Sequence, residues 1–497
     1  MIDSKENISL FGQKIGRVVA LEDSPTFEKV TVRLDAGRRV RPGELLVVPC
    51  NLEGSRKDFI ILRVSGAREF NEYENPMDSQ VRDMFNMNSV RGRDDLLRKF
   101  VLADTQPLEM VLQAEEEKLI TQDPTQLVHS GTEVYKLTSG VAGSLLGFPE
   151  PGGPSSMVLG DVVGESGIKV VLDANKCLPR HMLIVGSTGT GKSYFIGVIS
   201  EELQRLGIRH INIDIHGEMV KASSEMGGSN VLPGKELTVK LSSLSEPEVM
   251  EMLPITNDLH KDIAIKAFSN LKKTGKDFGI QEYKDEARSV AVSYGSKQNT
   301  MDIMDARIQT LESISILGKG YDWITALEKG GALVNIDCRE ISSHTELKII
   351  VGSVAREVMN LRKKEKIKEL VLSMDEAHMF LPAGETSPSS HVLGELIRFG
   401  RHHGVGIIIA SQSPNDIDRR IAKITNTRAF FAIEKTEIGS VTGLLADTPE
   451  DIIAALPRLK TGTCLLVGAR DIIKHAQIVQ VRKRTSTHGG ETPKMIK

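Results

Sequence analysis

The clearest chemical pattern in the chain is a glycine-rich octapeptide that follows a short apolar run, Met182 to Val185. Its residues are Gly186, Ser187, Thr188, Gly189, Thr190, Gly191, Lys192 and Ser193. Glycines at these positions let backbone amides curl around a phosphate, and the start of the next helix adds the positive end of its dipole. The spacing predicts that Lys192 contacts the β- and γ-phosphates of ATP and that Ser193 is a ligand of Mg²⁺. A glycine-rich turn that binds nothing is the alternative, and the flanking elements disfavour it.

A second pattern is a pair of carboxylates, Asp375 and Glu376, at the end of the apolar run Leu370 to Met374. Beside a phosphate loop, the first carboxylate would hold hydrated Mg²⁺ and the second would polarise the attacking water. The same pattern also occurs as an ordinary solvated strand end. Because it lies in the same α/β region as the octapeptide, we predict an enzyme that hydrolyses ATP rather than one that only binds it.

Two further polar residues flank the apolar run from Gly404 to Ser411. Gln412 ends this run, so its amide could contact the γ-phosphate. Arg401 precedes the run and would lie at the opposite edge of a sheet, from which it could reach only a neighbouring subunit's nucleotide, as an arginine finger. The alternative for Arg401 is a plain ion pair with a carboxylate at the surface.

A third group, Asp214, His216 and Glu218, ends another apolar run, with alternate residues on one side of the strand. All three residue types can bind metals. From the residues alone, we favour a polar strand end whose groups are satisfied by their neighbours.

Composition narrows the class of protein. The chain has 497 residues, a net charge of −3 and 4% aromatic residues. These values predict about two to four domains, and they give no general sign of nucleic-acid binding. The four cysteines are far apart, so we expect neither a disulfide framework nor a zinc site. We also expect no signal peptide and no membrane span, which fits a cytoplasmic protein.

The surrounding elements suggest an α/β fold with an N-terminal β-barrel. Residues 1–175 have short strands and regular turns, with a helical insertion expected at about 77–122. Residues 176–482 have buried apolar runs typical of a mostly parallel sheet, interrupted by a helical insert at about 244–328. The polar tail, 483–497, is expected to be a disordered segment or an arm.

The order of these motifs resembles the HerA family of the HerA/FtsK superfamily, and the most specific parts are DIHGE and GRHHGVG followed by SQ. The resemblance implies a RecA-like P-loop ATPase core and an N-terminal barrel of the HAS type. Similar proteins are hexameric, ATP-driven translocases and helicases of double-stranded DNA in archaea. They act with a NurA-type nuclease to process DNA ends for homologous recombination.

The resemblance also assigns roles to individual residues. It implies that Lys192 and Ser193 contact phosphate and Mg²⁺, that Asp375 binds the metal and that Glu376 activates water. Gln412 would sense the γ-phosphate, and Arg401 would act in trans. His216 and Glu218 match the second-strand motif of the family, and Arg428 is a further basic residue expected near the nucleotide.

Two other functions stay open from the sequence. One is a ring ATPase that moves protein or a conjugative substrate, and the other is a nucleotide-dependent clamp or scaffold without turnover. For a motor, we expect mobile pore loops at Met219–Asn230 and Phe380–His391, with Lys221, Arg419 and Arg420 as possible contacts to DNA phosphates.

Overall fold

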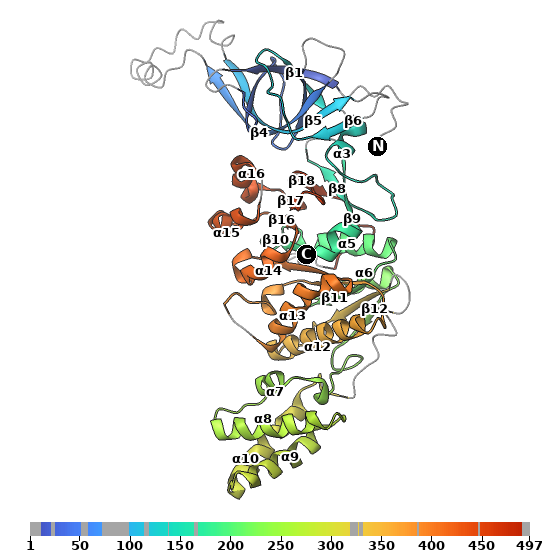
Figure 1. Ribbon diagram of the computed structural model, residues 1–497, viewed down its shortest axis with the longest axis vertical. Coiled ribbons are helices and arrows are strands. Elements are labelled where there is room, and N and C mark those ends of the chain that lie inside the picture. Colours follow the sequence, from blue (N-terminus) through green and yellow to red (C-terminus); the bar gives the residue numbers. More distant parts are fainter. Residues whose placement is uncertain are drawn as a thin grey trace, which may run out of the picture. The chain divides into compact units, whose positions relative to one another are not determined.

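The computed structural model describes residues 11–20, 25–50, 58–71, 99–113, 119–137, 139–163, 167–318, 327, 332–384, 387–445 and 448–489. The chain forms two compact units, residues 1–172 with 445–482 and residues 173–444 with 483–497 (Figure 1). The sequence predicts a boundary near residue 175 and assigns 445–482 to the ATPase domain. In the structure, residues 445–482 cluster with the N-terminal unit instead.

A closed antiparallel barrel forms the first part of the N-terminal unit. Its strands are β1 (Phe11–Val19), β2 (Val30–Leu34), β3 (Leu45–Pro49), β4 (Phe59–Asn71), β5 (Lys99–Gln113) and β7 (Glu133–Leu137). The strand order is β2-β1-β7-β3-β4-β5, and a pairing between β5 and β2 closes the barrel. A short strand, β6 (Leu119–Gln122), extends the sheet from β5. Closure removes the free edges that an open sheet would present.

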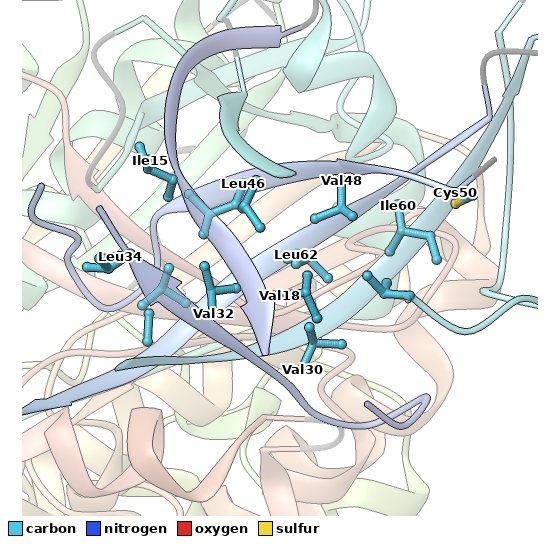
Figure 2. Packing of buried hydrophobic residues seen from close by; sticks show 14 of the residues in the cluster. Ile15, Val18, Val30, Val32, Leu34, Leu46, Val48, Cys50, Ile60 and Leu62 are labelled. Carbon is cyan, nitrogen blue, oxygen red and sulfur yellow. The ribbon is translucent and has the colours of Figure 1, made fainter. Parts of the chain in front are cut away.

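Alternation along the strands fills the barrel interior. Val30, Val32 and Leu34 are buried, whereas the Arg33 side chain between them is exposed. Because successive side chains point to opposite faces of a strand, one apolar set from each strand meets inside. Figure 2 shows this core, in which Leu46 and Val48 lie with Ile60 and Leu62. Such interior packing is typical of small barrels.

The predicted helical insertion is wrong for residues 99–113 and 119–122, which are strands β5 and β6. The rest of that prediction, residues 77–98 and 114–118, lies outside the described residues. Glu109 explains the error, because its charge suggests the polar face of a helix although the residue is only 1% exposed. It is buried because Lys474 and His475, distant in sequence, bond to its carboxylate at 2.8 and 2.7 Å. Burial alone would raise the pKa of Glu109, but these two bonds outweigh it and lower the pKa.

The N-terminal unit also contains a second, smaller sheet region. It has the order β17 (Thr463–Gly468), β18 (Gln477–Val481), β8 (Ser156–Val162) and β9 (Lys169–Asp173), with antiparallel pairing from β17 through β18 to β8. Helices α3 (Ser139–Leu145) and α16 (Glu450–Ala455) belong to the same unit.

The second unit is built on a parallel sheet. Its strands are β10 (Met182–Val185), β11 (Arg209–Asp214), β12 (Ser229–Val231), β13 (Leu333–Asp337), β14 (Leu370–Met374), β15 (Val405–Ser411) and β16 (Thr427–Phe430). They lie in the order β12-β13-β11-β14-β15-β10-β16, and every pair is parallel. All carboxyl ends therefore meet at one edge, which is where ligands bind in open α/β sheets.

Helices connect these strands. They are α4 (Ala174–Cys177), α5 (Lys192–Arg205), α6 (Val220–Glu225), α12 (His344–Lys363), α13 (Pro388–Phe399), α14 (Arg419–Ile424) and α15 (Ile438–Val441). Helices α12 and α13 pack against each other. Within the described residues, no helix is long and apolar enough to cross a membrane.

Four helices occupy the segment for which the sequence predicts a helical insert. They are α7 (Glu246–Met252), α8 (Asp258–Lys273), α9 (Ile280–Ser293) and α10 (Gln298–Gln309), and α9 lies against both α8 and α10 (Figure 1). Phe268 of α8 stacks edge-on against Tyr283 of α9, with ring centroids 5.5 Å apart. Apart from residue 327, residues 319–328 of the predicted insert lie outside the described residues.

The first part of the polar tail, residues 483–489, is ordered against α5. The backbone N–H groups of Thr485 and Ser486 donate to one carboxylate oxygen of Glu201 at 2.9 and 2.8 Å. The Arg484 side chain is 2% exposed and packs directly against Gly197. A Cβ atom at position 197 would lie only 2.3 Å from the Arg484 guanidinium. Of the two alternatives predicted for the tail, disorder is therefore wrong for these residues, because the buried Glu201 carboxylate on α5 accepts hydrogen bonds from their backbone.

Candidate active site

The phosphate loop joins β10 to α5 at the carboxyl edge of the parallel sheet. Gly189 and Gly191 have φ angles of +75° and +119°, a region that residues with a Cβ rarely adopt. At the base of the loop, the Ser187 N–H donates to the Ala432 carbonyl at 2.8 Å. The N–H groups of Gly186 and Thr190 also donate within the protein, to the Ser411 and Ser187 carbonyls at 3.3 and 3.4 Å. The amino end of α5, whose N-cap is Gly191, can face an anion.

Lys192 lies across this loop. It is 6% exposed, and its Nζ donates to the Ser187 carbonyl at 3.4 Å. The cation is thus held over the site where the loop amides would bind phosphates, and a phosphate oxygen is a stronger acceptor than the carbonyl it contacts now.

Ser193 and Asp375 form a set of oxygen donors suited to Mg²⁺. The Ser193 hydroxyl donates to Asp375 Oδ2 at 2.6 Å, so residues far apart in sequence converge at one point. Mg²⁺ favours carboxylate and hydroxyl oxygens together with substrate phosphates, and these two residues would hold it. The ion would neutralise charge that develops on the phosphates during hydrolysis.

The Glu376 backbone is strained. Its φ and ψ are +49° and +43°, a left-handed conformation that costs a non-glycine residue about 1–2 kcal/mol. The residue is 8% exposed, and its Oε1 accepts a hydrogen bond from Gln412 Nε2 at 2.8 Å. His378 Nδ1 lies 3.3 Å from the other carboxylate oxygen. Strain of this kind persists only where the surroundings fix the residue, which is common at catalytic positions.

Gln412 connects this glutamate to the phosphate loop. Its carbonyl oxygen accepts a hydrogen bond from the Thr188 hydroxyl at 3.0 Å. The parallel register brings these residues together, since Val185 pairs with Ser411 and Met374 pairs with Ile409. Thr188, Glu376 and Gln412 therefore lie at adjacent strand ends.

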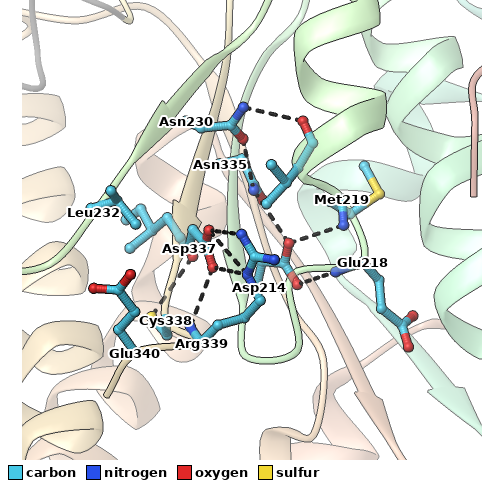
Figure 3. A network of polar contacts seen from close by, with 12 residues as sticks. Asp214, Glu218, Met219, Asn230, Leu232, Asn335, Asp337, Cys338, Arg339 and Glu340 are labelled. Carbon is cyan, nitrogen blue, oxygen red and sulfur yellow. Dashed lines mark hydrogen bonds and ion pairs between the residues drawn. The ribbon is translucent and has the colours of Figure 1, made fainter. Parts of the chain in front are cut away.

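The second-strand motif is organised around Asp214. The Asp214 carboxylate accepts hydrogen bonds from the backbone N–H groups of Glu218 and Met219 at 3.0 and 2.9 Å, and from Asn335 Nδ2 at 3.3 Å (Figure 3). Burial raises the pKa of Asp214, although the hydrogen bonds partly oppose that change. Asp214 therefore fixes the loop that carries His216 and Glu218.

A buried polar ladder extends from this loop across the sheet. His210 Nε2 lies 2.6 Å from the Ser373 hydroxyl, which donates to Asn212 Oδ1 at 2.6 Å. Asn212 Nδ2 in turn donates to Asn335 Oδ1 at 2.8 Å. Burial lowers the pKa of His210 to about 3, so its imidazole is neutral near pH 7. The ladder links β11 to β14, the strand that leads to Asp375.

His216 and Glu218 line a cavity of about 20 Å³ together with Ser193, Asp214 and Asp375. The structure thus places the predicted second-strand residues beside the magnesium ligands. Within the described ranges, however, no group of three or more His, Cys, Asp or Glu side chains could itself hold a metal ion. Of the three residues, Asp214 is satisfied by hydrogen bonds from its neighbours, as the sequence predicts for a polar strand end.

Arg401 lies at the opposite edge of the sheet. It belongs to the short 3-10 helix Gly400–His403, directly before β15, whereas Gln412 follows β15. A seven-residue strand spans about 20 Å, so Arg401 is far from its own chain's phosphate loop. Its side chain is exposed, and in the part of the chain that the structure describes it makes no hydrogen bond or ion pair. Burial lowers the pKa of the adjacent His181, and the charge on Arg401 lowers it further.

The structure does not bring Arg428 to the phosphate loop. Arg428 pairs in register with Leu183, in the interior of the sheet. Its guanidinium donates to the Leu444 carbonyl at 2.9 Å, and burial lowers its pKa. These contacts describe a structural arginine.

The predicted pore loops are only partly loops. Residues 219–230 contain α6 and β12, and the second segment, 380–391, begins with buried Phe380 and runs into α13. Lys221 is exposed, as expected for a phosphate contact, whereas the Arg420 guanidinium is paired with Asp418 at 2.6 Å.

Sequence reasoning missed several residues that shape the site. His378 lies within the Asp-Glu motif without an assigned role, and Asn335 and Ser373 belong to the ladder. A usable signal was present, because polar residues inside otherwise apolar strands need buried partners.

Comparisons with known proteins agree with this geometry. Residues 157–358 match the family described as the central domain of the helicase HerA. A probable helicase of Methanocaldococcus jannaschii is 25% identical over 368 residues, which cover 69% of this chain and 70% of the relative. A DNA double-strand break repair helicase HerA of Sulfurisphaera tokodaii is also 25% identical, covering 68% of this chain and 71% of the relative.

Solved structures support the fold. VirB4 of Thermoanaerobacter pseudethanolicus has a TM-score of 0.52 at 15% identity, covering 68% of this chain and 98% of that chain. The bacterial conjugative coupling protein TrwB has a TM-score of 0.50 at 13% identity, covering 72% and 94%. The parallel sheet with its phosphate loop therefore shares its fold with these two proteins.

Proposed function

Because residues 157–358 match the central domain of the helicase HerA and the parallel sheet carries a phosphate loop, we propose that the chain is an ATP-driven motor that translocates along double-stranded DNA. The observation that carries the proposal is the convergence of Lys192, Ser193, Asp375 and Glu376 at one edge of the sheet. The names of the relatives, which include DNA double-strand break repair helicases, support DNA as the substrate.

The proposed hydrolysis uses the chain's own residues. The loop amides and Lys192 bind the phosphates of ATP and orient the γ-phosphate. Glu376 accepts a hydrogen bond from a water and takes its proton as the oxygen attacks phosphorus. The bond from the γ-phosphorus to its bridging oxygen breaks, which gives ADP and phosphate. The ordered carboxylate of Glu376 favours turnover over a clamp that only binds nucleotide.

A ring of six copies completes this site. The guanidinium of Arg401 is exposed at the opposite edge of the sheet and has no partner among the described residues, which supports an arginine finger that acts on the neighbouring subunit's nucleotide. Hydrolysis would then change the contacts at each subunit interface and move the ring along the duplex.

We further propose a role in DNA-end processing for recombination repair, with a nuclease partner of the NurA type. This part rests on the resemblance of the motifs and on the relatives described as repair helicases. The N-terminal barrel is the surface we propose for that partner.

The central test measures ATP hydrolysis with and without duplex DNA, and mass in solution, on the same preparation. We expect an assembly of about six chains whose turnover rises when duplex is added and falls again at high salt, since phosphate contacts are ionic. ATP turnover that ignores DNA would favour a protein or conjugative cargo. A monomer with full turnover would overturn the motor.

A further inference from the structure

Two side chains, those of Gln412 and His378, lie beside the carboxylate of Glu376. Oε1 accepts from Gln412 Nε2 at 2.8 Å, and Oε2 lies 3.3 Å from His378 Nδ1. Neither the Glu376 Oε2 atom nor the His378 Nδ1 atom has a hydrogen-bond partner among the described residues. The oxygen that Gln412 holds is therefore the one with a well-formed bond, so Gln412 sets where the carboxylate lies.

Thr188 anchors the end of the Gln412 amide that faces away from the glutamate. A glutamine side chain has one carbonyl end and one NH₂ end, and only the NH₂ end can donate to a carboxylate. The Thr188 hydroxyl donates to the carbonyl end at 3.0 Å, which leaves the NH₂ end pointing at Glu376. Without that hydroxyl, the carbonyl end of the amide loses its anchor, and the NH₂ end is held less firmly against Glu376.

Thr188 and Glu376 differ in their surroundings. Thr188 is exposed at the tip of the phosphate loop, whereas Glu376 is 8% exposed. A hydrogen bond at an exposed position is easily exchanged for one to a charged phosphate oxygen, which is a stronger acceptor. An arriving γ-phosphate can therefore compete for the Thr188 hydroxyl and the Gln412 NH₂ group, while ADP lacks the group that competes.

We propose that Thr188 is a positioning residue, which acts through Gln412 to hold Glu376 in place and to release its Oε1 for the attacking water when a γ-phosphate binds. This inference deepens the proposed ATP hydrolysis and rests on it. The three residues of the relay belong to one chain, and the relay does not depend on DNA.

A matched pair of threonines in one loop provides the test. The hydroxyl of Thr190 donates to the Ser187 carbonyl at 2.7 Å, so it shapes the loop and does not contact Gln412. Steady-state ATP hydrolysis without DNA and binding of a fluorescent ADP are measured for Thr188→Val, Thr188→Ser and Thr190→Val.

We expect Thr188→Val to lower kcat about tenfold, the value of one hydrogen bond, with KM for ATP changed less than about twofold. Thr188→Ser should restore most of the rate, because it keeps the hydroxyl. Thr190→Val should instead raise KM and weaken ADP binding. Because Thr188 is exposed, its replacement should leave the unfolding midpoint unchanged.

Three results would overturn the relay: an unchanged kcat in Thr188→Val, a loss that serine does not restore, or a loss confined to KM. A wild-type chain that hydrolyses ATP but ignores duplex DNA would overturn the proposed motor and leave the relay intact. A wild-type chain with no turnover would overturn both.

Discussion

The two edges of the parallel sheet are very different. At the carboxyl edge, Ser193, Asp375, Glu376 and Gln412 form a continuous set of hydrogen bonds. At the amino edge, the guanidinium of Arg401 is exposed and, within the described residues, makes no hydrogen bond or ion pair. The residues of one edge are bonded to one another, whereas the other edge presents a charge that has no partner among the described residues.

This difference indicates how the chemistry is divided. Preorganised groups contribute most where they need not move during the reaction, which suits the groups around Mg²⁺ and water. A cation that arrives from another subunit makes hydrolysis depend on the interface. In the proposed ring, the carboxyl edge sets what reaction occurs, and the amino edge sets when it occurs.

The largest effect is expected at the carboxyl edge from Lys192→Ala. Removing the buried cation should reduce ATP turnover by at least about a thousandfold, since the developing phosphate charge loses its main counter-charge. Turnover measured at saturating ATP and without DNA checks this, and Lys221→Ala is the control with an exposed lysine in the same unit. Undiminished ATP turnover would show that the phosphate loop is not part of the active site.

Glu376→Gln should separate binding from hydrolysis. The amide keeps the size of the side chain but cannot accept the proton of water, so we expect hydrolysis to fall about 10²–10⁴-fold. ATP affinity, measured by a fluorescent analogue, should stay within a few-fold of wild type. A variant that no longer binds ATP would contradict the assigned division of roles.

Arg401→Ala tests the amino edge. We expect turnover to fall about 10³-fold, because an arginine finger stabilises the transition state of phosphoryl transfer. Mixing this variant with Glu376→Gln subunits should restore activity, since each mixed interface can combine an intact Arg401 with an intact Glu376. His402→Ala is the neighbouring control. If mixing does not restore activity, Arg401 acts on the nucleotide of its own subunit or only stabilises the fold.

The smallest effect concerns stability and pH. The pKa of His210 is about 3 in the folded protein and near 6.5 when unfolded, so only the unfolded state gains a proton between these values. Stability should be complete above pH 6.5 and fall by about 1.4 kcal/mol per pH unit below it. The unfolding midpoint, measured from pH 7 to 5, should fall less steeply in His210→Gln. His181 shifts in the same direction, so only the difference from wild type is diagnostic.

The carboxyl edge could be predicted from the sequence because its motifs are local. The octapeptide and the Asp-Glu pair each follow one apolar strand, and parallel strands align their ends without further information. The placement of Ser193 beside Asp375 follows from that rule, and the structure has the two side chains bonded at 2.6 Å.

Other features depend on partners that the local pattern does not reveal. Glu109 resembles a helix surface residue until Lys474 and His475 are known to bond to it. Arg428 resembles a nucleotide contact, but its guanidinium binds the Leu444 carbonyl. The tail resembles a free arm, although Glu201 on α5 binds its backbone. In each case a residue from another part of the chain determines the structure or role of the segment, and a single sequence does not show which residue that is.

Gly197 and Arg484 fit each other so closely that neither position can be redesigned alone. A methyl group at 197 would overlap the guanidinium, whereas removing the arginine would leave an open space along the first helix after the phosphate loop. Variant libraries that randomise these two codons together should therefore recover small residues at 197 wherever arginine is kept at 484, and larger ones where it is lost.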